Sequence, residues 1–224
     1  MENEDMEIKK AKPRKRLTRD KILDAAVAIA DADGLESLSM RKIAAKLQVE
    51  AMSLYNHIKN KDEILDGIVE RIGVEFSAPD TSGNWRKNMS QRAISAHEVL
   101  LKHPWATMLI VSRINLGPIM LRYVDATIGC LRGAGFSYQM ADYAWNAIDS
   151  HIYGFTLQEL NFPIPDDSYA STAEDHLDLI PAEQFPHLNG MARLVIDGQH
   201  DGQSNFEFGL DLILDGLERK LKAE

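Results

Sequence analysis

The segment Ala51–Ile58 concentrates side chains that can hydrogen-bond to nucleic acid. Leu54 and Ile58 are four residues apart, the spacing of one buried helix face, so the other side chains should point outward. Hydroxyl, amide and imidazole groups bind phosphates and base edges, and a thioether can contact a thymine methyl. The outward residues are Ala51, Met52, Ser53, Tyr55, Asn56 and His57. This pattern favours a DNA-contacting surface; a helical hairpin with a plain polar surface is the alternative.

Residues for catalysis or metal binding form no comparable pattern. His97 and His103 are six residues apart, which is not a helical ligand spacing, and the sequence lacks a Gly-x-Ser-x-Gly motif and a phosphate-binding glycine loop. Cys130 is the sole cysteine, which excludes an intramolecular disulfide and a multi-cysteine metal site. We therefore expect no catalytic residue, no metal and no cofactor, with a helical enzyme as a remote alternative.

Two short helices must position the outward residues. Ser39 can cap the first of them, and Gln48-Val49 interrupts the pattern before the second begins. Such a pair buries little by itself, so it needs the amphipathic segments 18–32 before it and 62–76 after it. We predict a helix-turn-helix whose second helix enters the major groove of DNA.

The net charge of −9 is unevenly distributed along the chain. Residues 1–61 contain 13 Lys and Arg and 10 Asp and Glu, a net charge of +3, whereas residues 62–224 carry a net charge of −12. This asymmetry indicates a nucleic-acid-facing end joined to an acidic body, although chance clustering of surface charge produces the same numbers. Residues 1–16 hold few large apolar side chains, so we expect a disordered basic arm that either reaches DNA or is a solvated tail.

The remainder of the chain is helical in pattern. Residues 77–84 form a loop, and apolar spacing predicts helices over 85–102, 106–112, 118–133, 137–160 and 206–221. The proline-rich residues 161–187 are predicted to be a long loop with room for a short helix. Sustained strand alternation is absent, so we predict an all-α fold. No apolar run is long enough to span a membrane and no secretory signal is recognisable, so we expect a cytoplasmic protein.

The N-terminal motif resembles the tetracycline repressor (TetR) family. The residues that carry the resemblance are 18–34, 38–47, Val49-Glu50 and 53–61, above all the run Leu-Tyr-x-His-x-x-x-Lys. The resemblance implies that Ser53, Tyr55, His57 and Lys61 contact phosphates, and that Arg41, Ala51, Met52 and Asn56 occupy base-reading positions. The family's turn usually has glycine where Gln48 stands, so we expect strain if Gln48 is left-handed.

The C-terminal part is similar to the tetracycline-repressor-like subclass of the same family. The markers are 115–118, 134–137, Gly154-x-x-Leu157 and 208–221. With the N-terminal motif they divide the chain into a three-helix DNA-binding domain with the helix-turn-helix (17–62), preceded by the disordered basic arm (1–16) that its composition predicts, and a larger helical ligand-binding and dimerisation domain (63–224). They also imply a homodimer through 137–160 and 204–221. The apolar stripe Leu210, Ile213, Leu214, Leu217 and Leu221 fits that interface, and intramolecular core is the alternative reading.

The same resemblance bears on the ligand. The family's magnesium-binding histidine aligns with Asn115 and its partner carboxylate with Gln158, and a neutral amide is a poor ligand for a divalent ion beside imidazole. We therefore expect an organic ligand with apolar or aromatic surface in place of a magnesium–tetracycline chelate. Candidate pocket residues are His97, Leu101, Trp105, Met108, Asn115, Tyr123, Trp145 and Asp149. Ordinary core packing is the alternative for each of them.

Together these patterns predict a ligand-responsive transcriptional regulator. We expect a repressor that binds palindromic operator double-stranded DNA as a homodimer and is released by a small-molecule inducer. A ligand-independent regulator or an activator is the alternative, because both need the same DNA-binding surface. The resemblance implies a mechanism for this release: ligand and DNA select different separations of the two recognition helices, and a coupling free energy of about 1–3 kcal/mol links the two binding events.

Overall fold

The computed structural model describes residues 16–165, 168–200 and 205–223, and every regular element in these ranges is helical. The predicted all-α fold is confirmed. The chain forms two compact units, Met1–Ile68 and Val69–Glu224, which meet inside one helix. Most of the predicted basic arm lies outside the described residues. Within the described ranges, no helix is both long and apolar enough to cross a membrane.

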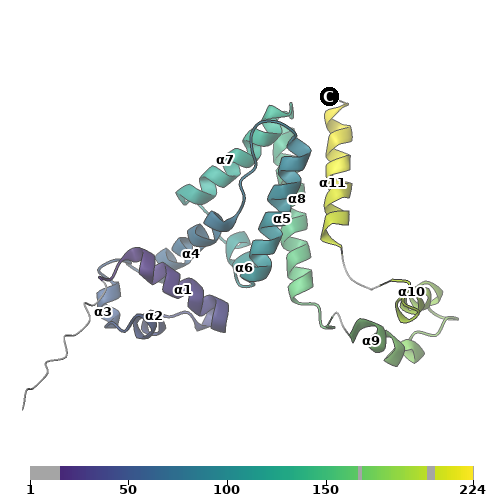
Figure 1. Cartoon of the computed structure of the whole chain (residues 1–224), viewed down its shortest axis with the longest axis horizontal. Coiled ribbons are helices and arrows are strands. Elements are labelled where there is room, and N and C mark those ends of the chain that lie inside the picture. The colour runs from purple at the N-terminus through teal and green to yellow at the C-terminus, as the bar shows by residue number, and fades with distance from the viewer. Residues whose placement is uncertain (1–15, 166–167, 201–204, 224) are drawn as a thin grey trace, which may run out of the picture. The chain divides into compact units, whose positions relative to one another are not determined.

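The first unit contains the predicted helix-turn-helix and the helices around it (Figure 1). Its elements are α1 (Arg19–Asp33), η1 (Leu35–Ser37), α2 (Met40–Leu47), α3 (Ala51–Leu54) and the first half of α4 (Lys61–Glu75). Thr18 and Ser39 cap α1 and α2, as predicted: each hydroxyl accepts a hydrogen bond from the backbone N–H three residues later.

The core of the first unit joins residues from all four helices. Ile22, Ile43, Leu54 and Ile68 are fully buried. Helices α1 and α4 approach closely at Gly67, where an added Cβ would lie 2.5 Å from Leu23 Cδ2. This dense packing makes a rigid base for the two short helices, which cannot stabilise each other alone.

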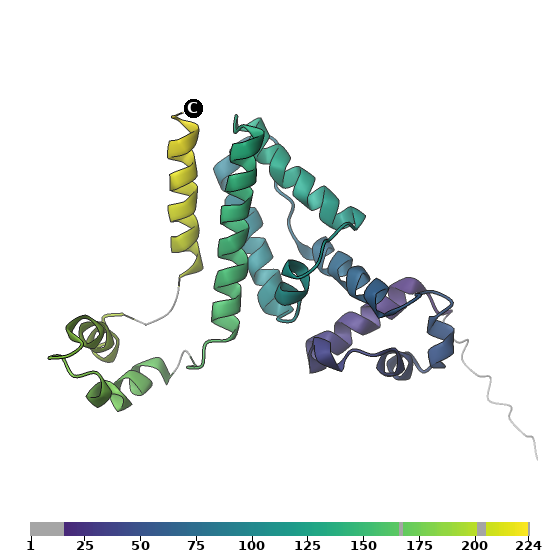
Figure 2. The ribbon, with the colours of Figure 1, turned by 180° about the vertical axis from the view of Figure 1, so that it is seen from behind.

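In the second unit, α5 (Trp85–Lys102), α7 (Pro118–Gly133), α8 (Tyr138–Leu160) and α11 (Phe206–Leu221) pack together, with α6 (Ala106–Val111) against α8. Figures 1 and 2 show α11 running alongside α8. The α11 residues Leu210, Leu214 and Leu217 are buried against this single chain. The predicted stripe is therefore largely intramolecular core, because α5 and α8 both contact α11.

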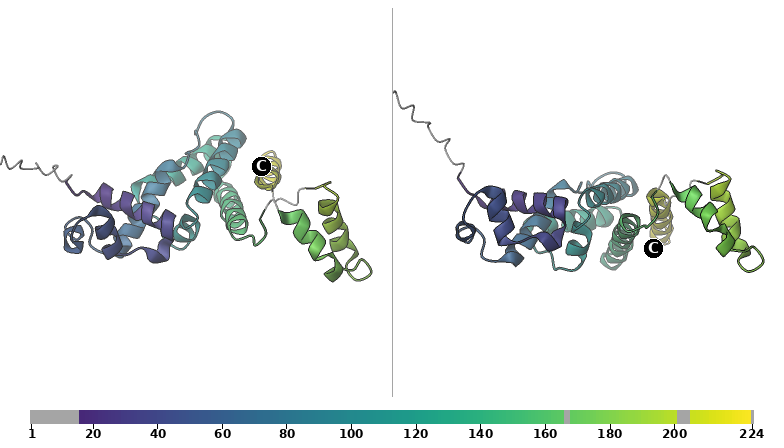
Figure 3. Two further views of the ribbon diagram at one scale, coloured as in Figure 1. Left: turned by 60° about the horizontal axis from the view of Figure 1, so that its bottom comes forward. Right: turned by 90° about the horizontal axis from the view of Figure 1, so that it is seen from below.

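Two helices occupy the region between α8 and α11. The predicted short helix corresponds to α9 (Tyr169–Asp175), which is followed by η3 (Leu177–Leu179). Helix α10 (Pro186–Ile196) was not predicted, although Pro186 occupies a first-turn position that proline favours. Helices α9 and α10 pack side by side (Figure 3). The long loop expected over 161–187 is thus much shorter than predicted.

Candidate DNA-binding surface and ligand cavity

The turn between α2 and α3 depends on Gln48. This residue has φ 56° and ψ 44°, and it is the one non-glycine residue of the described chain with a positive φ. The N–H of Gln48 donates to Ala45 O at 3.1 Å, and the N–H of Val49 donates to Ala44 O at 3.0 Å. These bonds close the end of α2 and satisfy its last carbonyls. Gln48 thus adopts the left-handed conformation in which strain is expected for a residue other than glycine.

The predicted recognition segment has one buried and one exposed side. Leu54 is 0% exposed and Ile58 is 1% exposed, so both anchor the segment to the core. Regular α-helix ends at Leu54 instead of Ile58, and the N–H groups of His57 and Ile58 both donate to Leu54 O. A tight turn therefore presents the last polar residues.

All eight predicted DNA-contact residues have side chains at least partly accessible to solvent. Met52 is 74% exposed and Tyr55 is 47% exposed. The other exposed members are Arg41, Asn56, His57 and Lys61, and Ala51 and Ser53 are half-buried. The surface thus combines two cationic groups with hydroxyl, amide, imidazole and thioether groups, which suits both phosphates and base edges.

A capping arrangement fixes the start of α4 and was missed in the sequence. The Asn60 side chain accepts a hydrogen bond from the Glu63 N–H at 2.8 Å, and the Glu63 carboxylate accepts one from the Lys59 N–H at 2.9 Å. Arg19 lies 3.5 Å from the same carboxylate. The spacing Asn-x-x-Glu was a readable signal for this helix start. It places Lys61 at the first position of α4.

A cavity of about 230 Å³ lies in the second unit. Residues from α5, α6, α7, α8 and the α6–α7 connection surround it, and they are Arg92, Ile110, Val111, Asn115, Met120, Tyr123, Val124, Trp145, Asp149 and Tyr153. Asn115, Tyr123, Trp145 and Asp149 were predicted from the sequence. Arg92 and Tyr153 were not. Arg92 shares a helix face with Met89, Ala93 and Ala96, so its place on an apolar face was the available signal.

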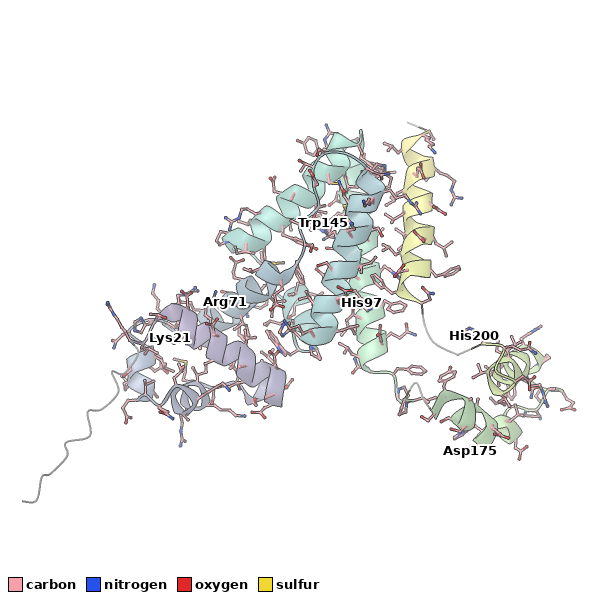
Figure 4. The ribbon with its side chains drawn as sticks, in the orientation of Figure 1. Lys21, Arg71, His97, Trp145, Asp175 and His200 are labelled. Atoms are coloured by element: carbon pink, nitrogen blue, oxygen red, sulfur yellow. The ribbon has the colours of Figure 1, made fainter. Side chains whose placement is uncertain are left out.

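The other four predicted pocket residues do not line this cavity. His97 stacks on Phe206 with ring centroids 4.1 Å apart, and Figure 4 shows it well away from Trp145 along the α5–α8 pair. Trp105 is buried, with its ring centroid 6.1 Å from that of His103. Leu101 is half-buried, and Met108 is 56% exposed. His97 thus belongs to the packing of α5 against α8 and α11.

A buried ion pair forms one wall of the cavity. Arg92 is 1% exposed, and its Nη1 lies 2.8 Å from Asp149 Oδ1. Arg92 Nε donates to Thr127 Oγ1 at 2.9 Å, and Trp145 Nε1 donates to Asp149 Oδ2 at 2.6 Å. The Arg92 guanidinium also lies 4.7 Å from the centre of the Tyr123 ring, a cation–π distance. Three helices thereby meet at one charged pair.

Two tyrosines complete the polar lining. Burial raises the pKa of Tyr123 to about 12, which exceeds the opposing effect of the Arg92 charge. Burial likewise raises the pKa of Tyr153, with the Asp149 charge acting in the same direction. Both phenols therefore keep their protons at neutral pH and are able to donate hydrogen bonds.

Of the two positions that the resemblance linked to a metal, Asn115 has a backbone partner and Gln158 faces solvent. Asn115 Nδ2 donates to Ile110 O at 2.9 Å. Glu159, beside Gln158, lies 3.2 Å from His97 Nε2. Across the described ranges, no group of three or more His, Cys, Asp or Glu side chains is arranged to hold a metal ion.

A helix-turn-helix unit joined to a helical unit with its own cavity defines a class of protein, the one-component DNA-binding regulators. Residues 22–74 match the model of the bacterial regulatory proteins of the tetR family, and residues 78–221 match that of the tetracyclin repressor-like C-terminal domain. The chain belongs to the TetR family of transcriptional regulators.

Named relatives align with almost the whole chain. An HTH-type transcriptional regulator of Saccharopolyspora erythraea is 33% identical over 93% of this chain and 88% of its own length. The HTH-type transcriptional repressor DrrR1 of Streptomyces coeruleorubidus is also 33% identical, over 92% of this chain and 79% of its own. The structure of the Streptomyces coelicolor TetR family protein ActR in complex with (S)-DNPA is 28% identical, with a TM-score of 0.78 over 92% of this chain and 99% of that one.

Proposed function

We propose that this chain is a ligand-responsive transcriptional repressor, which binds palindromic operator DNA as a homodimer and leaves it when a small-molecule inducer occupies the second unit. The observation that carries the proposal is the two-sided segment 51–58: Leu54 and Ile58 hold it to the core, while Met52 and Tyr55 are exposed beside it. Family membership supports the DNA-binding role, and relatives named as repressors favour repression over activation.

The eight side chains fall into two roles in this proposal. Ser53, Tyr55, His57 and Lys61 bind phosphates and set the position of the protein on DNA. The base-reading positions are Arg41, Ala51, Met52 and Asn56. Arg41 can pair with guanine and Asn56 with adenine, and Met52 suits a thymine methyl.

The dimer interface is proposed on α8 and α11. Because the inner faces of both helices are buried within one chain, a second copy must use their outer faces. On α11 that face carries Phe208, 66% exposed, and Leu212, 57% exposed; on α8 it carries Tyr143, 56% exposed. Added Cβ atoms at Gly154 and Gly216 would meet no atom within 4 Å, which leaves room for a partner helix to approach closely. A twofold interface of four helices accounts for these features.

The inducer site is proposed at the cavity beside Arg92 and Asp149. The solved complexes of the similar protein ActR with actinorhodin and with (S)-DNPA support a small-molecule ligand for this chain. The residues Asn115, Tyr123, Trp145 and Asp149 are its sequence-predicted members. A magnesium–tetracycline chelate is not expected, because Asn115 and Gln158 replace the residues that the resemblance associates with the metal. We assign the protein a role as a cytoplasmic regulator rather than as an enzyme.

DNA binding and release test the proposal directly. Purified protein is titrated into fluorescently labelled fragments from upstream of its own coding region, and anisotropy reports binding. We expect tight binding to a fragment that contains a palindrome with half-sites about 34–36 Å apart, the separation of successive major grooves, and release when inducer is added. An Asn56→Ala, Tyr55→Phe double variant is the negative control. Binding that is equally tight to every fragment, or equal for the variant, would contradict the proposal.

A further inference from the structure

The Tyr123 hydroxyl at the cavity is buried and lacks a hydrogen-bond partner among the described residues. Beside it, Arg92 Nη1 and Asp149 Oδ1 lie 2.8 Å apart and satisfy each other as a buried ion pair. An unsatisfied buried polar atom is costly, so a site that keeps a phenol hydroxyl unpaired beside an open volume is suited to a polar guest. The phenol can donate a hydrogen bond to an acceptor on that guest.

The charges around the cavity cancel. Of its ten lining residues, only Arg92 and Asp149 carry a charge at neutral pH, because both tyrosines remain protonated. A carboxylate ligand would leave one uncompensated negative charge in this buried space, and an ammonium ligand one positive charge. Burying an unpaired charge is far more costly than burying a hydrogen-bonded neutral group. The pair therefore disfavours ions of both signs.

The volume and the remaining lining limit the size and shape of the guest. At about 230 Å³ the cavity lies below the roughly 300–1,000 Å³ of pockets for drug-sized molecules. Trp145 and the two tyrosines offer aromatic surface, and Ile110 and Met120 add apolar surface. Flat ring systems match this combination of walls.

We propose that the inducer is an uncharged aromatic molecule of one or two fused rings, whose carbonyl oxygen accepts hydrogen bonds from the Tyr123 hydroxyl and from Arg92. Asp149 holds the guanidinium and cancels its charge, which makes the site selective for the neutral carbonyl over a carboxylate. The inference rests on the proposed function only in placing the inducer at this cavity.

Four probes with the same naphthalene ring separate the possibilities. They are 2-acetylnaphthalene (neutral carbonyl), 2-ethylnaphthalene (no acceptor), 2-naphthoate (anion) and 2-naphthylmethylammonium (cation). Calorimetry with the full chain at neutral pH gives each dissociation constant. We expect the ketone to bind at least about tenfold more tightly than each of the other three, the ratio that one or two well-formed hydrogen bonds supply.

Two variants test the assigned atoms. Tyr123→Phe should lower the affinity for the ketone about three- to tenfold and leave that for 2-ethylnaphthalene unchanged, because only the hydroxyl is lost. Its matched control is Tyr138→Phe, at a residue that is 73% exposed. Asp149→Asn removes the negative charge that balances Arg92. The affinity for 2-naphthoate should therefore rise at least about tenfold and exceed the affinity for the ketone. The matched control is Asp142→Asn, at an exposed position of the same helix, which should change neither the affinity for 2-naphthoate nor that for the ketone.

The order of the four probe affinities for the wild-type chain tests the proposed ligand class even if Asp149→Asn fails to fold. The tightest binding by the anion or the cation, equal binding of the ketone and the hydrocarbon, or no binding by any probe would overturn the inference. Operator binding, followed by anisotropy in the same samples, is independent of these results. Loss of the ketone preference in a protein that still binds operator DNA therefore refutes the ligand class and leaves the proposed function standing.

Discussion

Glu70 on α4 holds the beginning of α7 at Met120. Its Oε1 accepts the Met120 N–H at 3.0 Å, and its Oε2 accepts the Ile119 N–H at 2.8 Å. These two N–H groups have no partner within their own helix, and a carboxylate at a helix N-terminus is also favoured by the helix dipole. Gly117 makes the approach possible, since an added Cβ would lie 2.1 Å from Glu70 Cδ. Met120 lines the cavity, so α4 is bonded directly to a helix of the cavity wall.

Glu70→Gln is expected to lower the free energy of unfolding by about 1–2 kcal/mol, because one charged acceptor is replaced by a weaker neutral one and a donor is placed against an N–H group. Urea unfolding measures the change. The same variant should bind operator DNA but respond less to inducer, since α4 runs unbroken from Lys61 to Glu75 into the helix-turn-helix unit. Glu174→Gln, at an exposed position, is the control. Full stability together with an undiminished response would argue against this link.

The DNA surface should divide into two kinds of residue. Tyr55→Phe and Lys61→Ala are expected to weaken binding to all sequences alike, and loss of the Lys61 charge should reduce the slope of log affinity against log salt by about 0.9. Arg41→Ala and Asn56→Ala should instead relax the preference at particular base pairs, by about 1–3 kcal/mol each. Binding-site selection at several salt concentrations measures both effects. An unchanged affinity for Tyr55→Phe and Lys61→Ala alike would refute the division.

Gln48→Gly is expected to stabilise the protein by up to about 1 kcal/mol. Glycine adopts φ 56° without the steric cost that Gln48 bears, and this gain exceeds the extra flexibility that glycine gives the unfolded chain. Chemical denaturation provides the comparison. Gln48→Ala keeps a Cβ in the left-handed region and serves as the control that should not stabilise. If Gln48→Gly lowers the free energy of unfolding, the contacts of the Gln48 side chain stabilise the protein by more than the left-handed backbone strain destabilises it.

The two faces of α11 should respond differently to a charge. Leu214→Asp places a carboxylate at a residue that is 0% exposed, so the variant should fail to fold. Leu212→Asp changes a residue that is 57% exposed and should leave the fold intact while weakening the dimer, because its carboxylate would be buried at the proposed twofold interface. Sedimentation and circular dichroism distinguish the two results. A folded Leu212→Asp variant with unchanged dimerisation would exclude this face of α11.

Acid should destabilise the protein through His97. Burial lowers the pKa of this imidazole below 6.5, against the opposing charges of Glu159 and Glu98, with His151 acting in the same direction as burial. The unfolded chain therefore takes up the proton first as the pH falls. The contribution of neutral His97 is complete above about pH 6.5 and is lost as the pH falls from there towards the folded-state pKa. Unfolding curves between pH 5 and 7.5 should show this loss, and it should be smaller in His97→Gln.

Local patterns in the sequence determined much of the architecture. The caps Thr18 and Ser39, the buried pair Leu54 and Ile58, and the outward polar residues between them follow from hydrogen bonding and from the 3.6-residue period of a helix, which need only neighbouring residues. The family resemblance, which places glycine at the position of Gln48, marked it as a candidate for a left-handed turn, and the structure shows that conformation. Helix α10 was missed because prolines and acidic residues around it obscured a short apolar pattern.

The tertiary structure alone decided which residues share the cavity. Arg92, Tyr123 and Asp149 are far apart in the sequence, and no periodicity shows that a charged residue on α5 will meet a carboxylate on α8 over a tyrosine ring from α7. The tertiary structure also decided the role of α11, because its apolar stripe is equally consistent with intramolecular core and with a dimer interface. Its burial depends on which helices pack against it, and that choice is made by the summed fit of side chains distant in the chain rather than by any local preference.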